Sequence, residues 1–181
     1  MASVPERIQF TLSRLDVRRA DRVLEVGCGT GVLADLIANG APEGRYVGID
    51  RSATAVSATR RRLATLASEV EAEVIQSSLA DLEPAQTGEF SKAVAVNVNL
   101  FWTRSATAEL DILRRSLATD GFLLLVYQAA GAPERLLDPL VANLDGAGYE
   151  HDEEFVDGET TRLLAVECRP AALPGRKVTT T

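Results

Sequence analysis

The sequence predicts an α/β fold, a three-layer αβα sandwich in which helices cover both faces of a mostly parallel sheet. Strand-like apolar runs alternate with helical patterns along most of the chain, as is typical of parallel sheets. The segment Val23–Gly31 ends an apolar run with an acid and then places three glycines at alternate positions, and a second apolar run ends in Asp50. Two late strand-like runs flank Asp157-Gly158, a hairpin signal that would place one antiparallel strand in the sheet.

Size and composition indicate a single globular domain. The chain of 181 residues has the usual length of one domain, and its 46% hydrophobic and 25% charged residues are ordinary for a globule. We assign residues 1–169 to this domain, with a helical segment over residues 1–21. Residues 170–181 contain two prolines and three terminal threonines, and we expect them to form a mobile tail.

Charge and cysteine content narrow the partners and the compartment. The net charge of −7 argues against a nucleic-acid partner, which usually requires a basic footprint, and the dense basic run Arg60–Arg62 is expected on a solvated helix face. No apolar run has the length of a signal peptide or a membrane span, so no membrane partner is expected. Cys28 and Cys168 lack C-x-x-C spacing, which indicates a reduced, cytoplasmic protein without a metal site.

Strands are expected where short apolar runs are bounded by turn residues. These runs are Val23–Val26, Tyr46–Asp50, Val70–Ser78, Ala93–Val98, Phe122–Tyr127, Tyr149–Val156 and Thr161–Glu167. The run Phe122–Tyr127 is so apolar that it predicts a central strand buried on both faces.

Helices are expected between these strands, where apolar residues recur at helical spacing. The segments are residues 5–19, 32–40, 52–67, 106–117 and 136–144. Asn39-Gly40 is a signal for the end of the second helix, and Ser52 is expected to cap the third, whose inner face includes Ala67. Pro139 lies inside the last pattern, so that helix either kinks there or begins there with Asp138 as its cap.

The glycine turn predicts a ligand that carries a ribose. Glycines at alternate positions let the backbone approach a ligand closely, and the helix that follows offers amide groups to an anionic group. Asp50, at the tip of the next strand, can accept hydrogen bonds from both ribose hydroxyls. The ligand is therefore expected at the carboxyl ends of the parallel strands.

The spacing of the glycines distinguishes two classes of ligand. The dinucleotide fingerprint G-x-G-x-x-G would need a glycine at Val32, whereas the third glycine here is Gly31, which disfavours a nicotinamide dehydrogenase. An amino-acid moiety needs an acceptor for its ammonium group, which Glu25 and the backbone around Gly27 could supply. It also needs donors for its carboxylate, which Thr30 and nearby amides could supply.

From Val23 to about Cys168 the chain resembles the class I S-adenosylmethionine-dependent methyltransferases. Its Val-Leu-Glu-Val-Gly-Cys-Gly-Thr-Gly run matches the first motif of that family at every position. The resemblance implies a transferase with S-adenosyl-L-methionine as its cofactor. It also implies a Rossmann-like, seven-stranded sheet in the order 3-2-1-4-5-7-6, in which strand 7 is antiparallel.

The resemblance also implies a set of cofactor-binding residues along one edge of the sheet. In chain order these are Glu25, Gly27, Cys28, Gly29, Gly31, Asp50, Arg51, Ser78, Leu79 and Asn97. The three glycines would lie against the methionine part, and Asp50 would hold the ribose. Arg51, Ser78 and Leu79 would surround the adenine, and Asn97 would lie near the sulfonium.

Three positions depart from the family pattern. The family often has an acid where Ser78 stands, although Asp81 is close by, and its frequent Phe-Asp is Phe90-Ser91 here. The usual Pro-Gly-Gly before the fifth strand is Thr119–Gly121. The departures at Ser78 and Ser91 motivate a second hypothesis, in which the chain binds the cofactor without catalysis and acts as a partner or regulatory subunit.

The acceptor site is expected after the fourth strand, over Asn97–Trp102. In this segment, relatives that methylate adenine or amide nitrogens carry two prolines, cytosine enzymes carry Pro-Cys, and metal-assisted enzymes carry an acid. Residues 97–102 contain none of these, which disfavours all three acceptor classes. Methyl transfer mainly requires alignment of the acceptor, and no catalytic residue is assigned. Asn99, Trp102 and Tyr127 are candidate acceptor-binding residues, although Trp102 has an alternative role in packing a helix onto the sheet.

The acceptor itself is expected to be a small molecule. Few residues precede the first strand and no long insertion follows the fourth or fifth, so the chain offers little material for a substrate-binding cap. A site completed at a homodimer interface or by a partner is the alternative. His151, the one histidine, stands beside Asp152, Glu153 and Glu154, and a surface position is expected for it.

Overall fold

The computed structural model describes residues 4–66, 70–128, 134–158 and 162–171. The helices are α1 (Glu6–Leu15), α2 (Val32–Gly40), α3 (Ala53–Leu63), the 3₁₀ turn η1 (Leu79–Asp81), α4 (Pro84–Thr87), α5 (Leu100–Thr103), α6 (Thr107–Ser116) and α7 (Glu134–Gly146). The strands are β1 (Arg22–Val26), β2 (Arg45–Asp50), β3 (Glu71–Gln76), β4 (Phe90–Val96), β5 (Leu117–Gln128), β6 (Tyr149–Asp157) and β7 (Arg162–Pro170).

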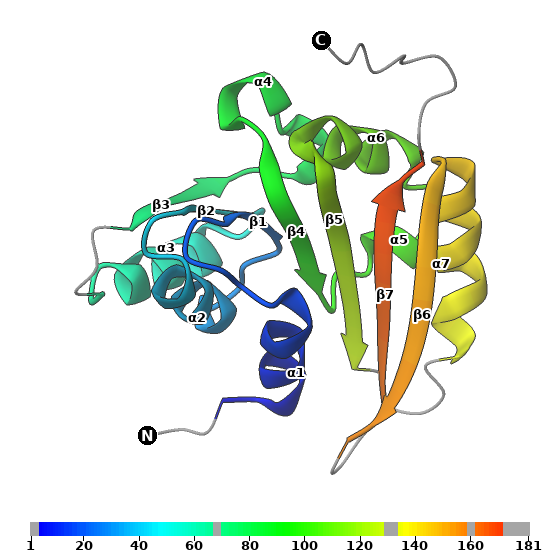
Figure 1. Ribbon diagram of the computed structural model, residues 1–181, viewed down its shortest axis with the longest axis horizontal. Helices are drawn as coiled ribbons and strands as arrows, with labels where there is room; N and C mark the ends of the chain where they lie inside the picture. The colour runs from blue at the N-terminus through cyan, green and yellow to red at the C-terminus, as the bar shows by residue number, and fades with distance from the viewer. Residues whose placement is uncertain (1–3, 67–69, 129–133, 159–161, 172–181) are drawn as a thin grey trace, which may run out of the picture.

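The seven strands form one sheet in the order β3-β2-β1-β4-β5-β7-β6 (Figure 1). The pairs from β3 through β5 are parallel, and β7 is antiparallel to both β5 and β6. The predicted strand order and the antiparallel seventh strand are therefore confirmed. The chain order reverses between β1 and β4, and such a switch point is where ligands bind in open α/β sheets.

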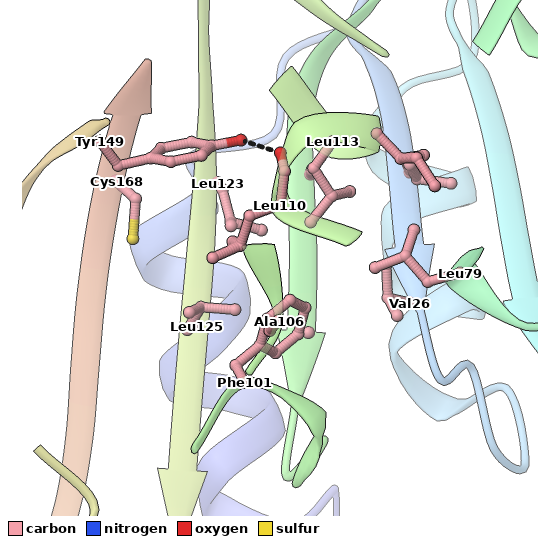
Figure 2. Packing of buried hydrophobic residues seen from close by; sticks show 14 of the residues in the cluster. Val26, Leu79, Phe101, Ala106, Leu110, Leu113, Leu123, Leu125, Tyr149 and Cys168 are labelled. Atoms are coloured by element: carbon pink, nitrogen blue, oxygen red, sulfur yellow. Dashed lines mark hydrogen bonds between the residues drawn. The ribbon is translucent and has the colours of Figure 1, made fainter. Parts of the chain in front are cut away.

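Helices pack on both faces of the sheet and bury a separate core on each. Alternate strand residues divide between the cores because successive side chains of a strand point to opposite faces. On one face, Val23 and Val94 pack with α1, α2 and α3. On the other, Leu24 packs with α5, α6 and α7, and Figure 2 shows part of this core, in which the Tyr149 hydroxyl donates to the Leu110 carbonyl at 2.8 Å.

Several predicted boundaries change in the structure. The fourth strand ends at Val96 rather than at residue 98, because Asn97 adopts a left-handed conformation with φ of 55°. The first helix ends at Leu15, since Asp16 is also left-handed. The helix predicted over 106–117 gives way to β5 at Leu117, which pairs with Phe90 before a register shift.

The predicted helix signals have mixed outcomes. The Ser52 cap is confirmed, because its side chain accepts a hydrogen bond from the Ala55 amide at 3.3 Å. A start at Pro139 is wrong: α7 begins at Glu134 and continues through the proline. Ala67, predicted on the inner face of the third helix, lies outside the described residues.

The closing hairpin is confirmed by nine antiparallel pairs from Tyr149↔Pro170 to Asp157↔Arg162. β7 extends through Pro170, the first residue of the predicted tail, and residues 172–181 lie outside the described part of the chain. None of the helices in that described part has the length and apolar character needed to cross a membrane.

Candidate functional site

A cavity of about 510 Å³ opens at the carboxyl ends of β1, β2 and β4, where the strand order reverses. Its walls come from four short stretches and from the segment that leads into α6: residues 26–27, 49–51, 77–80, 96–100, 103–104 and 109. Two other hollows, of about 540 and 740 Å³, lie beside β3 and between α4 and α6, and no residue of the glycine turn lines either one. Of the predicted cofactor-binding residues, Gly27, Asp50, Arg51, Ser78, Leu79 and Asn97 line this cavity.

The glycine turn at the end of β1 uses conformations and close contacts that exclude larger residues. Gly27 and Gly31 have φ values of 76° and 77°. A Cβ at Gly27 would lie 2.8 Å from the Val98 side chain, and a Cβ at Gly31 would lie 2.9 Å from the Cα of Thr59. Both positions therefore require glycine for packing as well as for backbone geometry.

Hydrogen bonds anchor this turn to β2 and α3. The amides of Gly27 and Cys28 both donate to the Ile49 carbonyl, at 2.8 and 3.1 Å. The Thr59 hydroxyl donates to the Gly29 carbonyl at 2.9 Å. The turn is thus held in one shape before any ligand arrives, which lowers the entropic cost of binding.

Asp50 joins the turn to the cavity. One carboxylate oxygen accepts from the Gly29 amide at 3.0 Å, and the other accepts from the Ser52 amide at 2.8 Å. A carboxylate offers about four lone-pair sites, so these two amides leave capacity for further donors. Asp50 lines the cavity and is therefore placed to receive the paired hydroxyls of a ribose.

The predicted adenine contacts lie together along the next wall. Arg51, Ser78 and Leu79 all line the cavity. Leu79 is 4% exposed and packs in the same core as Val26, beside which Figure 2 shows it, so it presents an apolar surface to a flat base. The Ser78 hydroxyl donates to the Asp81 carboxylate at 2.6 Å, which brings an acid close to the position where the family often carries one.

Asn97 and Asn99 form the wall beyond β4. The Asn97 amide donates to the Val126 carbonyl and its side-chain oxygen accepts from the Gln128 amide, both at 2.8 Å. Asparagine tolerates the left-handed conformation that this turn requires. The Asn99 carbonyl accepts from the Thr103 amide at 3.1 Å and so begins α5, and both asparagines remain exposed at the cavity.

Glu25 is not among the residues that line the cavity, and its contact with an ammonium group stays a prediction. It lies on the opposite face of β1 from Leu24 and Val26, and it is 4% exposed. The Tyr46 hydroxyl donates to its carboxylate at 2.6 Å. Burial raises the pKa of Glu25 to about 8, against the opposing effect of the Tyr46 hydrogen bond and with a smaller contribution from the Asp50 charge.

Other predicted residues also lie outside the cavity walls. Cys28, Gly29 and Gly31 belong to the turn behind its lining, and burial raises the pKa of the Cys28 thiol to about 11. Trp102 packs against the core on the α5–α7 face, which is its alternative predicted role. Tyr127 is 2% exposed and donates to the Val98 carbonyl at 3.1 Å, so it supports a wall residue without facing the acceptor.

His151 lies in β6 close to the end of α7. Its ring nitrogens contact Glu153 at 2.7 Å and Asp145 at 3.1 Å. Partial burial lowers the pKa of His151, but the hydrogen bonds to the two carboxylates outweigh this effect and the net shift is upward. The histidine belongs to an acidic cluster away from the cavity, in agreement with its predicted position.

Sequence reasoning missed Arg104 and Glu109, which both line the cavity. Glu109 lies in the first turn of α6, where its side chain is 5% exposed and pairs with the Arg104 guanidinium. A signal was available, because Glu109 falls at helical spacing between Ala106 and Leu113 on an otherwise apolar stripe. A charged residue that is buried on such a stripe is almost always paired, so a cationic partner could have been expected nearby.

The residues present fit an adenosyl cofactor. The volume is within the range of roughly 300–1,000 Å³ that is typical of small-molecule sites. A Cβ placed on Gly29 would meet nothing closer than the Gly27 carbonyl at 3.9 Å, so open space adjoins the turn. Asp50 has lone pairs for a ribose, and Leu79 has an apolar surface for a base.

Comparisons with known proteins identify the family of this chain. Residues 23–121, more than half of the chain, match the methyltransferase domain family. Trans-aconitate 2-methyltransferase of Paracidovorax citrulli is 32% identical over 114 residues, which are 63% of this chain and 41% of that protein. Ribosomal RNA small subunit methyltransferase C of Klebsiella pneumoniae is 46% identical over 56 residues, which are 31% of this chain and 16% of that protein.

A solved structure shows the same fold. The precorrin-6y C5,15-methyltransferase of Geobacter metallireducens has a TM-score of 0.70 at 15% identity, and the match covers 94% of both chains. The chain spans less than half the length of the two curated relatives. With its first motif, its strand order and the family match together, the chain belongs to the class I S-adenosylmethionine-dependent methyltransferases.

Proposed function

We propose that this protein transfers the methyl group of S-adenosylmethionine to a small-molecule acceptor bound in the cavity at the switch point. The observation that carries the proposal is Asp50, which holds the glycine turn through the Gly29 amide and also lines the cavity. In this proposal the cofactor site comprises the turn together with Asp50, Arg51, Ser78, Leu79 and Asn97. The acceptor lies between Asn97 and Glu109.

The chain's own contribution to the reaction is positioning. S-adenosylmethionine supplies an activated methyl group on its sulfonium. The rigid turn and Asp50 orient the donor, and the wall formed by Asn97, Asn99 and Leu100 orients the acceptor opposite it. Correct alignment of two reactants is worth roughly 7–11 kcal/mol, which is why the site needs no proton-transfer dyad.

A small molecule is favoured over RNA as the acceptor. The net charge of −7 opposes binding to a polyanion. The relative that acts on trans-aconitate matches twice as many residues of this chain as the relative that acts on ribosomal RNA, 114 against 56. Trans-aconitate is therefore the first compound for an acceptor panel.

The second hypothesis is that the chain binds the cofactor without catalysis and acts as a partner. One of the two observations behind this hypothesis is Ser91. The Ser91 hydroxyl instead donates to Asp21 at 2.9 Å and accepts from the Arg22 amide at 3.1 Å. These contacts lie at the start of β1 and β4, at the end of the sheet away from the cavity. The change at Ser91 therefore gives no support to a loss of catalysis.

The test is calorimetric titration of the purified protein with S-adenosylmethionine, S-adenosylhomocysteine and NAD. We expect micromolar binding of the two adenosyl ligands and none of NAD, followed by methylation of a compound in the acceptor panel. Asp50→Ala should weaken adenosyl binding at least tenfold, whereas Asp111→Ala, which removes an exposed carboxylate on α6, should not. Failure of the wild-type protein to bind either adenosyl ligand would refute the proposal.

A further inference from the structure

The acceptor side of the cavity presents an ion pair between Arg104 and Glu109. The two partners differ sharply in exposure: the Glu109 side chain is 5% exposed, whereas the Arg104 side chain is 58% exposed. A compound that enters from the solvent side therefore meets the guanidinium, and the carboxylate lies behind it.

Arg104 is held in place by contacts with Asn143 of α7, Glu109 of α6 and its neighbour Ser105. The side chain of Asn143 in α7 donates to the carbonyls of Phe101 and Arg104 at 3.0 and 2.9 Å, and it accepts from the Ala106 amide at 3.1 Å. The guanidinium donates to Glu109 and, at 2.8 Å, to the Ser105 carbonyl. The cation is thus built into the wall of the cavity, unlike a surface arginine with a free side chain.

The guanidinium keeps binding capacity after these contacts. It carries five N–H donors in a planar fork, and the described residues accept from two of its nitrogens, one bond each. Such a fork matches the two oxygens of a carboxylate or a phosphate. The arrangement therefore suits an anionic group on the acceptor.

The charge balance of the cavity selects between these two anions. Its charged lining residues are two arginines and two carboxylates: Arg51, Arg104, Asp50 and Glu109. A phosphate with nearly two negative charges would face this balanced lining with a single guanidinium that Glu109 already neutralises. Each carboxylate group of an organic acid carries only one charge, and the group that meets Arg104 needs only the remaining donors of this guanidinium.

We propose that Arg104 binds a carboxylate of the methyl acceptor and that Glu109 is a positioning residue that aims the guanidinium. This inference rests on the proposed function, because it takes the cavity to be the acceptor site. It names the acceptor class as small organic acids. It assigns Arg104 as the residue that distinguishes an acid from its neutral ester.

The test measures, by calorimetry, the binding of small organic acids to the protein saturated with S-adenosylhomocysteine. Succinate, citrate and trans-aconitate are each compared with the neutral ester in which every carboxylate is methylated. At least one acid should bind, and its ester should bind at least tenfold more weakly. Arg104→Gln should weaken binding of the acid about tenfold or more and should leave S-adenosylhomocysteine affinity unchanged. With a turned-over acid, KM should rise by a similar factor while kcat changes less.

Two further variants separate recognition from folding. Arg104→Gln/Glu109→Gln removes the buried charge that the single variant would leave unpaired, and it should lose acid binding as well. Arg115→Gln, whose guanidinium bonds Asp111 on the same helix outside the cavity, is the matched control and should bind like the wild type.

The outcomes separate the two proposals. Binding of S-adenosylhomocysteine without binding of any acid, or acid binding that survives in Arg104→Gln, would overturn the role of Arg104 and leave the proposed function standing. Failure to bind S-adenosylhomocysteine would overturn the proposed function, and the inference about Arg104 with it.

Discussion

At the scale of single residues, Glu25 shows how one motif position can serve the fold. It belongs to the first motif, yet its carboxylate lies beneath the turn against the Tyr46 hydroxyl, on the face covered by α2 and α3. Burial is complete enough to raise its pKa to about 8. Glu25 therefore supports β1 and β2 as a largely protonated acid near neutral pH.

This assignment predicts a pH dependence of stability. Unfolded Glu25 ionises near pH 4.5, whereas folded Glu25 keeps its proton up to about pH 8, so this residue lowers stability progressively as pH rises between those values. The expected slope is about 1.4 kcal/mol per pH unit. Glu25→Gln has no carboxyl group to ionise at this position. From pH 5 to pH 7.5, its free energy of unfolding should rise relative to that of the wild type by about 1.4 kcal/mol per pH unit.

Urea titrations of both proteins at several pH values measure this difference. Glu43→Gln, which removes an exposed carboxylate paired with Arg19, is the control and should follow the wild-type curve. A constant gap between Glu25→Gln and the wild type across the range would show that Glu25 is ionised in the folded state.

At the scale of elements, one side chain connects three helices at the acceptor wall. Asn143 of α7 reaches the end of α5 and the start of α6. The residues between these helices, Arg104 to Ala106, form the loop from which Arg104 lines the cavity. The Ala106 amide lies at the N-terminus of α6, where helical amides have no partner within the helix. Asn143 satisfies one of these groups from another element.

Asn143→Ala should therefore destabilise the protein by about 1–3 kcal/mol, because it leaves the Ala106 amide and the Phe101 carbonyl without their partner. Asn39→Ala removes contacts with Asp35 at an exposed position of α2 and should stay within about 0.5 kcal/mol of the wild type. Chemical denaturation measures both changes. Equal effects of the two substitutions would contradict a special role for Asn143.

At the scale of the whole molecule, local patterns predicted the strands and helices, and the strand order was predictable because the first motif carries a resemblance to a family whose sheet has that order. The burial of Glu25 against Tyr46 was not predictable, because alternation along β1 shows that residues 25 and 26 face opposite ways but not what packs on each face. Arg104 was missed because its position at the cavity depends on a short loop whose backbone is held by the side chain of Asn143. Such contacts between distant segments leave no periodic signal.

The site belongs to the folded state, so ligand binding should stabilise the entire domain. S-adenosylmethionine at about 100 times its Kd adds ~2.7 kcal/mol of stability, which corresponds to roughly 5–10 °C in Tm for a domain of this size. NAD should produce no shift, and Asp50→Ala should lose the shift at the same ligand concentration. Scanning calorimetry provides the measurement, and an equal shift with NAD would contradict an adenosyl-specific site.

The anchors of the cavity fall into two separate stretches of chain. Hydrogen bonds with Ile49, Asp50 and Thr59 hold the glycine turn. Hydrogen bonds with Ser105, Glu109 and Asn143 hold the loop that carries Arg104. Substitutions in the loop that carries Arg104 therefore leave the hydrogen bonds that hold the glycine turn unchanged. Under the proposed function, acceptor preference can therefore change while binding of the methyl donor is kept, because no anchoring residue serves both stretches.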